Sequence, residues 1–115
     1  MSQLDSTTFA DGIRQGDSVE FSVGPVPVAD LTDGTWTCWI GAYDSGNTEM
    51  TKKQITGLNG TNQKFLAYFT PAETAAWSKG TATIVAQIDR TDTTPPISVE
   101  YHAQAEVSAQ LLTTP

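Results

Sequence analysis

The residues that could support nucleophilic or acid–base chemistry are few and widely spaced in this sequence. His102 is the one histidine, and it stands on the polar side of a stretch that alternates apolar and polar residues. No G-x-S-x-G sequence is present to expose a serine on a sharp turn, so a Ser-His-Asp triad lacks its nucleophile. Cys38 shares a side with Trp36 and Ile40, which indicates a small buried hydrophobe rather than an activated thiol. We therefore expect no catalytic residues and a protein that is not an enzyme.

A metal site requires several histidines, cysteines or carboxylates at ligand spacing, and one short segment offers oxygen ligands. Residues 44–47 read Asp-Ser-Gly-Asn, which could present oxygens to calcium. The same residues are typical of a tight hairpin turn in which Gly46 or Asn47 takes a positive φ. The turn is the simpler interpretation, so we expect no metal and no cofactor.

Outward-facing aromatic rings are the remaining candidates for a binding site. Trp39 and Tyr68 have the parity opposite to the apolar residues of their segments, which predicts that both face away from the core. Coplanar exposed rings would make a sugar-binding platform, whereas large exposed rings on a small protein usually mark a protein interface. We predict an interface made by Trp39, Leu66, Tyr68 and Phe9, with Leu66 and Tyr68 on one stripe. Trp39 is expected beside that stripe if the two strands pair.

Short alternating segments separated by turn residues must position these side chains. The clearest runs from 98 to 109, where every second residue is apolar, which is the period of a strand with one face on a core. Trp36 lies on the predicted core side of the most apolar segment. The same period predicts further strands at 17–23, 35–43, 64–69 and 81–89. After the turn, the polar segment 48–56 is expected to return as a strand at a sheet edge, where its lysines would discourage edge-to-edge pairing.

One segment breaks the period of two. Residues 70–73 read Thr-Pro-Ala-Glu, a capping box with proline at the first helical position, and predict a short helix that ends near Trp77. Six or seven strands and one helical turn indicate an all-β fold, an immunoglobulin-like antiparallel β-sandwich, with a small barrel as the alternative. We expect one domain at 16–110, after a polar arm at 1–15 and before a tail at 111–115.

Charge and length narrow the classes of partner. The chain has 115 residues and a net charge of −7, which repels nucleic acid and anionic membrane surfaces. No apolar run is long enough to span a bilayer. The single cysteine cannot form an internal disulfide, so the fold does not depend on an oxidising compartment.

Two stretches give the sequence a family resemblance. Residues 16–21 followed by 31–40, and later residues 69–84, set a Gly-Asp strand, a Leu-Thr-Asp-Gly strand and a Thr-Pro helical turn in this order. The order resembles small immunoglobulin-like domains of tailed-phage virions, with the N-terminal domain of phage upper baseplate proteins as the nearest kind. The resemblance covers about 16–109. Because this chain stops after the domain, it looks more like a capsid decoration protein than a baseplate protein.

The resemblance implies a virion structural protein that is made in the cytoplasm of a bacterial host. We expect it to dock on other phage structural proteins, such as major capsid or tail proteins, and to reinforce the assembled particle; it could also form a homo-oligomer there. A tail, neck or baseplate attachment module is the alternative within this class. A carbohydrate-binding module that acts through Trp39 and Tyr68 is the alternative from another class.

Overall fold

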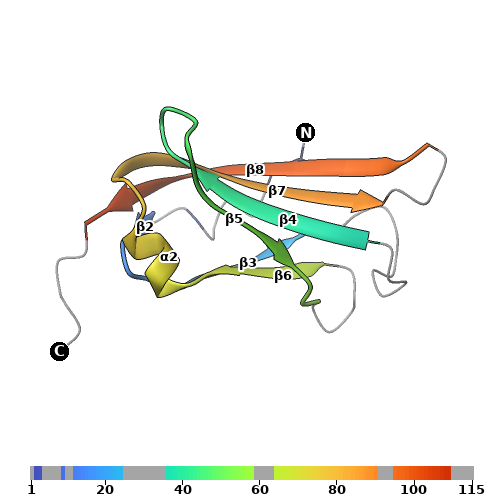
Figure 1. The fold of residues 1–115 in the computed structure, drawn as a ribbon, viewed down its shortest axis with the longest axis horizontal. Helices are drawn as coiled ribbons and strands as arrows, with labels where there is room; N and C mark the ends of the chain where they lie inside the picture. Colours follow the sequence, from blue (N-terminus) through green and yellow to red (C-terminus); the bar gives the residue numbers. More distant parts are fainter. Residues whose placement is uncertain are drawn as a thin grey trace.

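The computed structural model describes residues 2–3, 9, 12–24, 36–58, 64–90 and 95–109, and every structural feature given below belongs to these residues. The described chain is mostly β-structure with one short helix, arranged as a curled six-stranded sheet that faces a two-stranded sheet (Figure 1). The large sheet has the order β1-β8-β7-β4-β5, with β2 also paired to β8. The small sheet consists of β3 and β6.

The alternating segments form the strands that the sequence predicts. The large sheet contains β4 (Trp36–Tyr43), β5 (Glu49–Ile55), β7 (Gly80–Arg90) and β8 (Ile97–Ser108). The small sheet contains β3 (Val19–Val23) and β6 (Phe65–Phe69), paired antiparallel. Each predicted boundary agrees with the structure to within about two residues, the usual spread at the end of an element.

The prediction of a purely antiparallel sandwich is wrong at one edge of the large sheet. The two-residue strands β1 (Ser2–Gln3) and β2 (Ile13–Arg14) both pair with β8, and both run parallel to it. Both short strands run in the same direction as β8, so the large sheet is mixed. Two residues cannot show a period of two, so these strands leave no alternating signal in the sequence.

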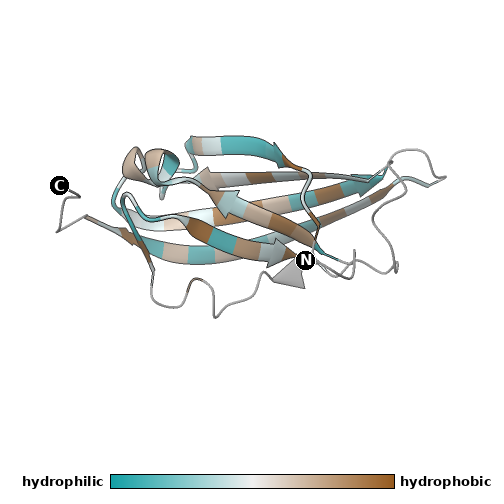
Figure 2. Ribbon diagram, turned by 90° about the horizontal axis from the view of Figure 1, so that it is seen from below, coloured by the Kyte–Doolittle hydropathy of each residue, from teal (hydrophilic) through white to brown (hydrophobic). Residues whose placement is uncertain are grey.

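The core lies between the two sheets and contains the apolar side of each strand. Figure 2 shows the alternation of hydropathy along the strands. Trp36 is buried as predicted and Cys38 is fully covered, as are the inward residues of β7. The aromatic part of the core is a chain of ring contacts that runs from the N-terminal segment across the small sheet to the residue pair after α2 (Pro71–Ala75): Phe9 to Phe21, Phe21 to Phe69, and Phe69 to Trp77.

The N-terminal arm is not separate from the domain, contrary to the boundary expected at residue 16. Ile13 is 3% exposed and Phe9 is 4% exposed, and both belong to the main core cluster. The side-chain amide of Gln15 donates a 2.6 Å hydrogen bond to the carbonyl of Trp77. The polar composition of residues 1–15 conceals two core residues that are spaced too far apart to form a recognisable pattern.

The predicted helix is α2 (Pro71–Ala75), and its capping box is present as expected. The backbone N–H of Glu73 donates to the Thr70 hydroxyl, and the Thr70 N–H donates to the Glu73 carboxylate. Thr74 is fully buried; its hydroxyl donates to the Asp17 carbonyl at 2.7 Å and accepts from the Gly16 N–H at 3.1 Å. The helix is therefore anchored to the segment that leads into β3.

Candidate functional site

The residues with catalytic potential lie apart from one another. His102 is on the outer side of β8, where its imidazole contacts the carboxylate of Glu100 two residues earlier. Burial, with a smaller effect from the charge of Asp89, raises the pKa of the Cys38 thiol to about 12, so the thiol stays protonated at neutral pH. Among the residues that the structure describes, neither side chain contacts the partner that a nucleophile and its base require.

In the turn at residues 44–47, backbone N–H groups already donate to a carboxylate oxygen that could otherwise bind calcium. One Asp44 oxygen, Oδ1, accepts hydrogen bonds from the backbone N–H groups of Gly46 and Thr48, both at 2.9 Å. Asn47 has a φ of 63°, as the turn interpretation predicts. Within the described ranges, no three His, Cys, Asp or Glu side chains lie close enough together to hold a metal ion.

The large exposed hydrophobic residues of the described chain are three of the predicted interface residues. Trp39 is 41% exposed, Leu66 is 46% exposed and Tyr68 is 50% exposed. Each projects from a strand whose neighbouring residues are buried, so each lies on the outer side of its sheet. The prediction that these residues face outward is confirmed.

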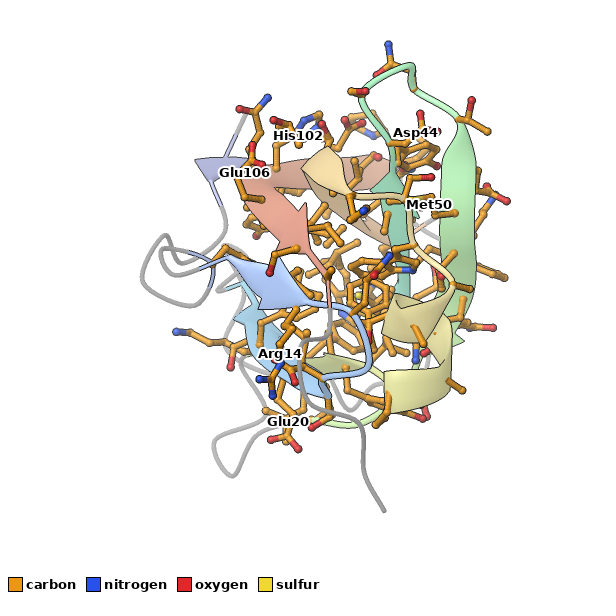
Figure 3. The ribbon with its side chains drawn as sticks, turned by 90° about the vertical axis from the view of Figure 1, so that its left-hand side faces the viewer. Arg14, Glu20, Asp44, Met50, His102 and Glu106 are labelled. Carbon is orange, nitrogen blue, oxygen red and sulfur yellow. The ribbon has the colours of Figure 1, made fainter. Side chains whose placement is uncertain are left out.

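Trp39 does not lie beside Tyr68, because their strands belong to different sheets. β4 pairs with β5 and β7, whereas β6 pairs with β3. Glu20 pairs with Tyr68 in the small sheet, and His102 lies on the outer side of the large sheet. In Figure 3, Glu20 and His102 project on opposite sides of the core. The exposed hydrophobic residues therefore form two surfaces rather than one.

Phe9 is not part of either surface. Its ring is 4% exposed and makes an edge-to-face contact with Phe21, with 5.4 Å between the ring centroids. The expectation that Phe9 contributes to an interface is corrected by this placement. An isolated phenylalanine in a polar arm gives no sign of the core pocket that it enters.

The first surface, called here the small-sheet face, is the outer side of β3 and β6. It consists of Glu20, Ser22, Lys64, Leu66 and Tyr68. A shallow groove of about 530 Å³ runs along it, with Phe21, Gly24 and Ala67 completing its lining. The face combines two exposed hydrophobic side chains with one acidic and one basic residue, which is a composition typical of protein contacts.

Tyr68 is held in position by a lysine from the other sheet. The Nζ of Lys53, on β5, lies 3.9 Å from the centroid of the Tyr68 ring and donates a 2.7 Å hydrogen bond to Glu73. Glu73 also accepts the Thr70 N–H of the capping box. A contact of a cation with a ring face is worth about 0.5–1 kcal/mol at exposed sites. The helix cap thus fixes the lysine, and the lysine fixes the ring.

These contacts also set the ionisation of Glu73. Partial burial alone would raise the pKa of this carboxyl, but the hydrogen bonds from Lys53 and Thr70 outweigh it and hold the pKa below its usual 4.5. Because the pKa of Glu73 is lower in the folded state than in the unfolded state, its ionised carboxylate stabilises the protein at pH values above the unfolded-state pKa. This stabilisation is lost as the pH falls through the folded-state pKa.

We expect Glu73→Gln to weaken the fall in stability on acidification. Wild type loses the Glu73 contribution as the pH drops below 4.5, whereas the amide has no proton to gain. Lys53→Met removes the main donor to this carboxylate and should flatten the same dependence. Urea unfolding at neutral pH and below pH 4.5 measures it. An unchanged acid dependence in both variants would show that another carboxylate controls it.

The second surface, called here the large-sheet face, is the outer side of β4 with its neighbours. It contains Trp39, Tyr43, Lys52, Val85 and Gln87 around a small hollow of about 110 Å³. The Nζ of Lys52 lies 5.6 Å from the centroid of the Trp39 ring. Tyr43 has the same sequence parity as Trp39, and both rings belong to this face.

Gly41 lies between Trp39 and Tyr43 on β4, and its missing side chain leaves room for the Tyr43 ring. A Cβ at Gly41 would come within 3.1 Å of the Tyr43 ring and 3.3 Å of the Thr51 carbonyl oxygen. The Tyr43 ring therefore lies over the glycine and covers the backbone that the missing side chain would leave open. An aromatic-glycine-aromatic alternation on one strand is the signal that could have identified this surface.

No protein-family profile matches the sequence, and no curated protein is significantly similar to it. In the described part of the chain, no helix is long and apolar enough to cross a membrane. The small-sheet face and the large-sheet face are therefore the features from which a function can be inferred.

Proposed function

We propose that this chain is a non-enzymatic structural protein of a tailed-phage virion, which docks on and reinforces the assembled particle. The observation that carries the proposal is the pair of outward aromatic faces, one on each sheet of a small β domain. A domain with contact surfaces on both sides can bridge neighbouring subunits. The immunoglobulin-like assignment belongs to this proposal, supported by the two facing sheets and the sequence resemblance.

The reinforcement would act by burial of apolar surface without covalent chemistry. Trp39, Leu66 and Tyr68 are each close to half exposed, and burying their remaining apolar area contributes about 25 cal/mol per Å². Aromatic residues in a polar surround are common centres of binding energy at interfaces. The partners would be other phage structural proteins, such as capsid or tail proteins, and the chain would be made in the cytoplasm of the host.

The carbohydrate-binding alternative is less well supported by the geometry. A sugar platform needs open, coplanar rings, but Trp39 and Tyr68 lie on different sheets. Lys53 occupies one face of the Tyr68 ring, and Lys52 lies over the Trp39 ring. A tail, neck or baseplate attachment module uses the same surfaces as a decoration protein, and only its place on the particle differs.

The proposal is tested by returning variants to particles that have been stripped of this protein. We expect Trp39→Ala to leave the melting temperature close to wild type and to weaken binding to the particle by at least about fivefold, or about 1 kcal/mol. Gln104→Ala is the matched control, because it changes another exposed residue on the outer side of the large sheet. Its binding should equal that of wild type.

Two results would overturn the docking proposal. One is equal particle binding by wild type, Trp39→Ala and Tyr68→Ala. The other is specific binding of wild type on a glycan array that is lost in Trp39→Ala. This result would favour a carbohydrate-binding module.

A further inference from the structure

Opposite charges lie at the two ends of the small-sheet face, with apolar groups between them. The register of β3 and β6 places Glu20 opposite Tyr68 and Ser22 opposite Leu66 on this face. One residue beyond the paired strands, the same register places Gly24 opposite Lys64, so the face has three rows of residues. Glu20 and Lys64 are therefore at opposite ends. Neither has an ion-pair partner among the residues that the structure describes.

We infer that two copies of this chain pack against each other through their small-sheet faces about a two-fold axis. The axis lies in the plane of the contact and crosses both strands at the row of Leu66. Rotation about it reverses the strand direction in the second copy. Lys64 of each copy is then placed over the row of Glu20 and Tyr68 in the other, and the two Leu66 side chains meet at the axis.

The charge pattern favours a second copy over an unrelated occupant. Each face has a negative end, an apolar centre and a positive end. When one copy is reversed, the negative end of each copy meets the positive end of the other, so the ion pair between Glu20 and Lys64 forms twice. Ser22 and Gly24 are small, so the β3 side of the face leaves the groove of about 530 Å³ open. Under this rotation the open β3 sides of the two copies face each other, while Leu66 and Tyr68 of each copy lie over β6 of the other.

The contact is expected to be weak in free solution. The face is only two short strands wide, well below the area of a standard stable interface, and each copy carries a net charge of −7. We expect a dissociation constant on the order of 0.1–1 mM. On a particle, neighbouring copies would be held at high effective concentration, so the same contact would be populated.

The biological role of this contact rests on the proposed function, but the contact can be measured on the isolated protein. The experiment is a charge exchange followed by sedimentation equilibrium and by amide chemical shifts at increasing protein concentration. We expect Glu20→Lys alone and Lys64→Glu alone each to weaken self-association roughly tenfold. Either variant turns both symmetry-related ion pairs of the dimer into pairs of like charge. The double variant restores both pairs and should associate like wild type.

In wild type, the concentration-dependent shifts should map to β3 and β6. Self-association without rescue in the double variant, shifts confined to other strands, or no shifts up to millimolar protein would each overturn the inference. Trp39→Ala should associate like wild type, since Trp39 lies on the other sheet. A protein that self-associates as expected but fails to bind stripped particles would contradict the proposed function alone.

Discussion

Trp77→Ala is expected to lower the free energy of unfolding by about 3–5 kcal/mol. Trp77 is 1% exposed and is among the largest fully buried side chains in the described chain. Its ring packs edge-to-face on Phe69 with 4.9 Å between centroids, and its indole N–H donates a 2.8 Å hydrogen bond to the Thr51 hydroxyl. Truncation would leave a cavity where α2, β5 and β6 meet. Urea unfolding of the purified variant measures the effect.

Two milder variants separate the packing of Trp77 from its hydrogen bond. Trp77→Phe keeps an aromatic ring but removes the indole donor, and Thr51→Val removes the acceptor. A double-mutant cycle should assign about 0.5–1.5 kcal/mol to the hydrogen bond, with the larger remainder due to packing. If Trp77→Ala unfolds at the wild-type urea concentration, the ring does not hold the helix segment on the core, and the aromatic chain described above is wrong.

The sequence allows the strands and the helix to be predicted because each carries a local signal. Alternation locates β4, β7 and β8 to within a few residues, and the capping box at Thr70 locates the start of α2. Parity alone predicts that Trp39 and Tyr68 face outward. These features depend on residues that are neighbours in the chain, so their physical cause can be seen in the sequence.

The arrangement of the surfaces could not be predicted, because it depends on which strands pair. β5 follows β4 as a hairpin in the large sheet, but β6 pairs with β3, more than forty residues earlier. This long-range pairing separates Tyr68 from Trp39 and joins it to Glu20. Lys53 has a similar origin: sequence reasoning assigns it to an edge strand, but the curled sheet brings its ammonium to the Tyr68 ring.

The N-terminal segment gives the second large expected effect, since removal of residues 1–15 should prevent stable folding. The sequence alone places this polar arm before the domain that is expected at 16–110. In the structure, Ile13 pairs with Val107 on β8 and is 3% exposed, and Phe9 extends the aromatic chain of the core. Each such side chain contributes about 2–5 kcal/mol. Together they approach the 5–15 kcal/mol that stabilises a typical domain.

Point variants test the same conclusion without shortening the chain. Ile13→Ala should lower the unfolding free energy by about 2–4 kcal/mol, while Arg14→Ala, the next residue of β2, should change it by less than about 0.5 kcal/mol. The side chains of Ile13 and Arg14 differ in burial but share the same short strand, so the pair isolates core packing from strand pairing. A truncated protein that melts cooperatively near the wild-type temperature, or equal effects of the two substitutions, would show that the arm only covers the sheet edge and that the domain begins at β3.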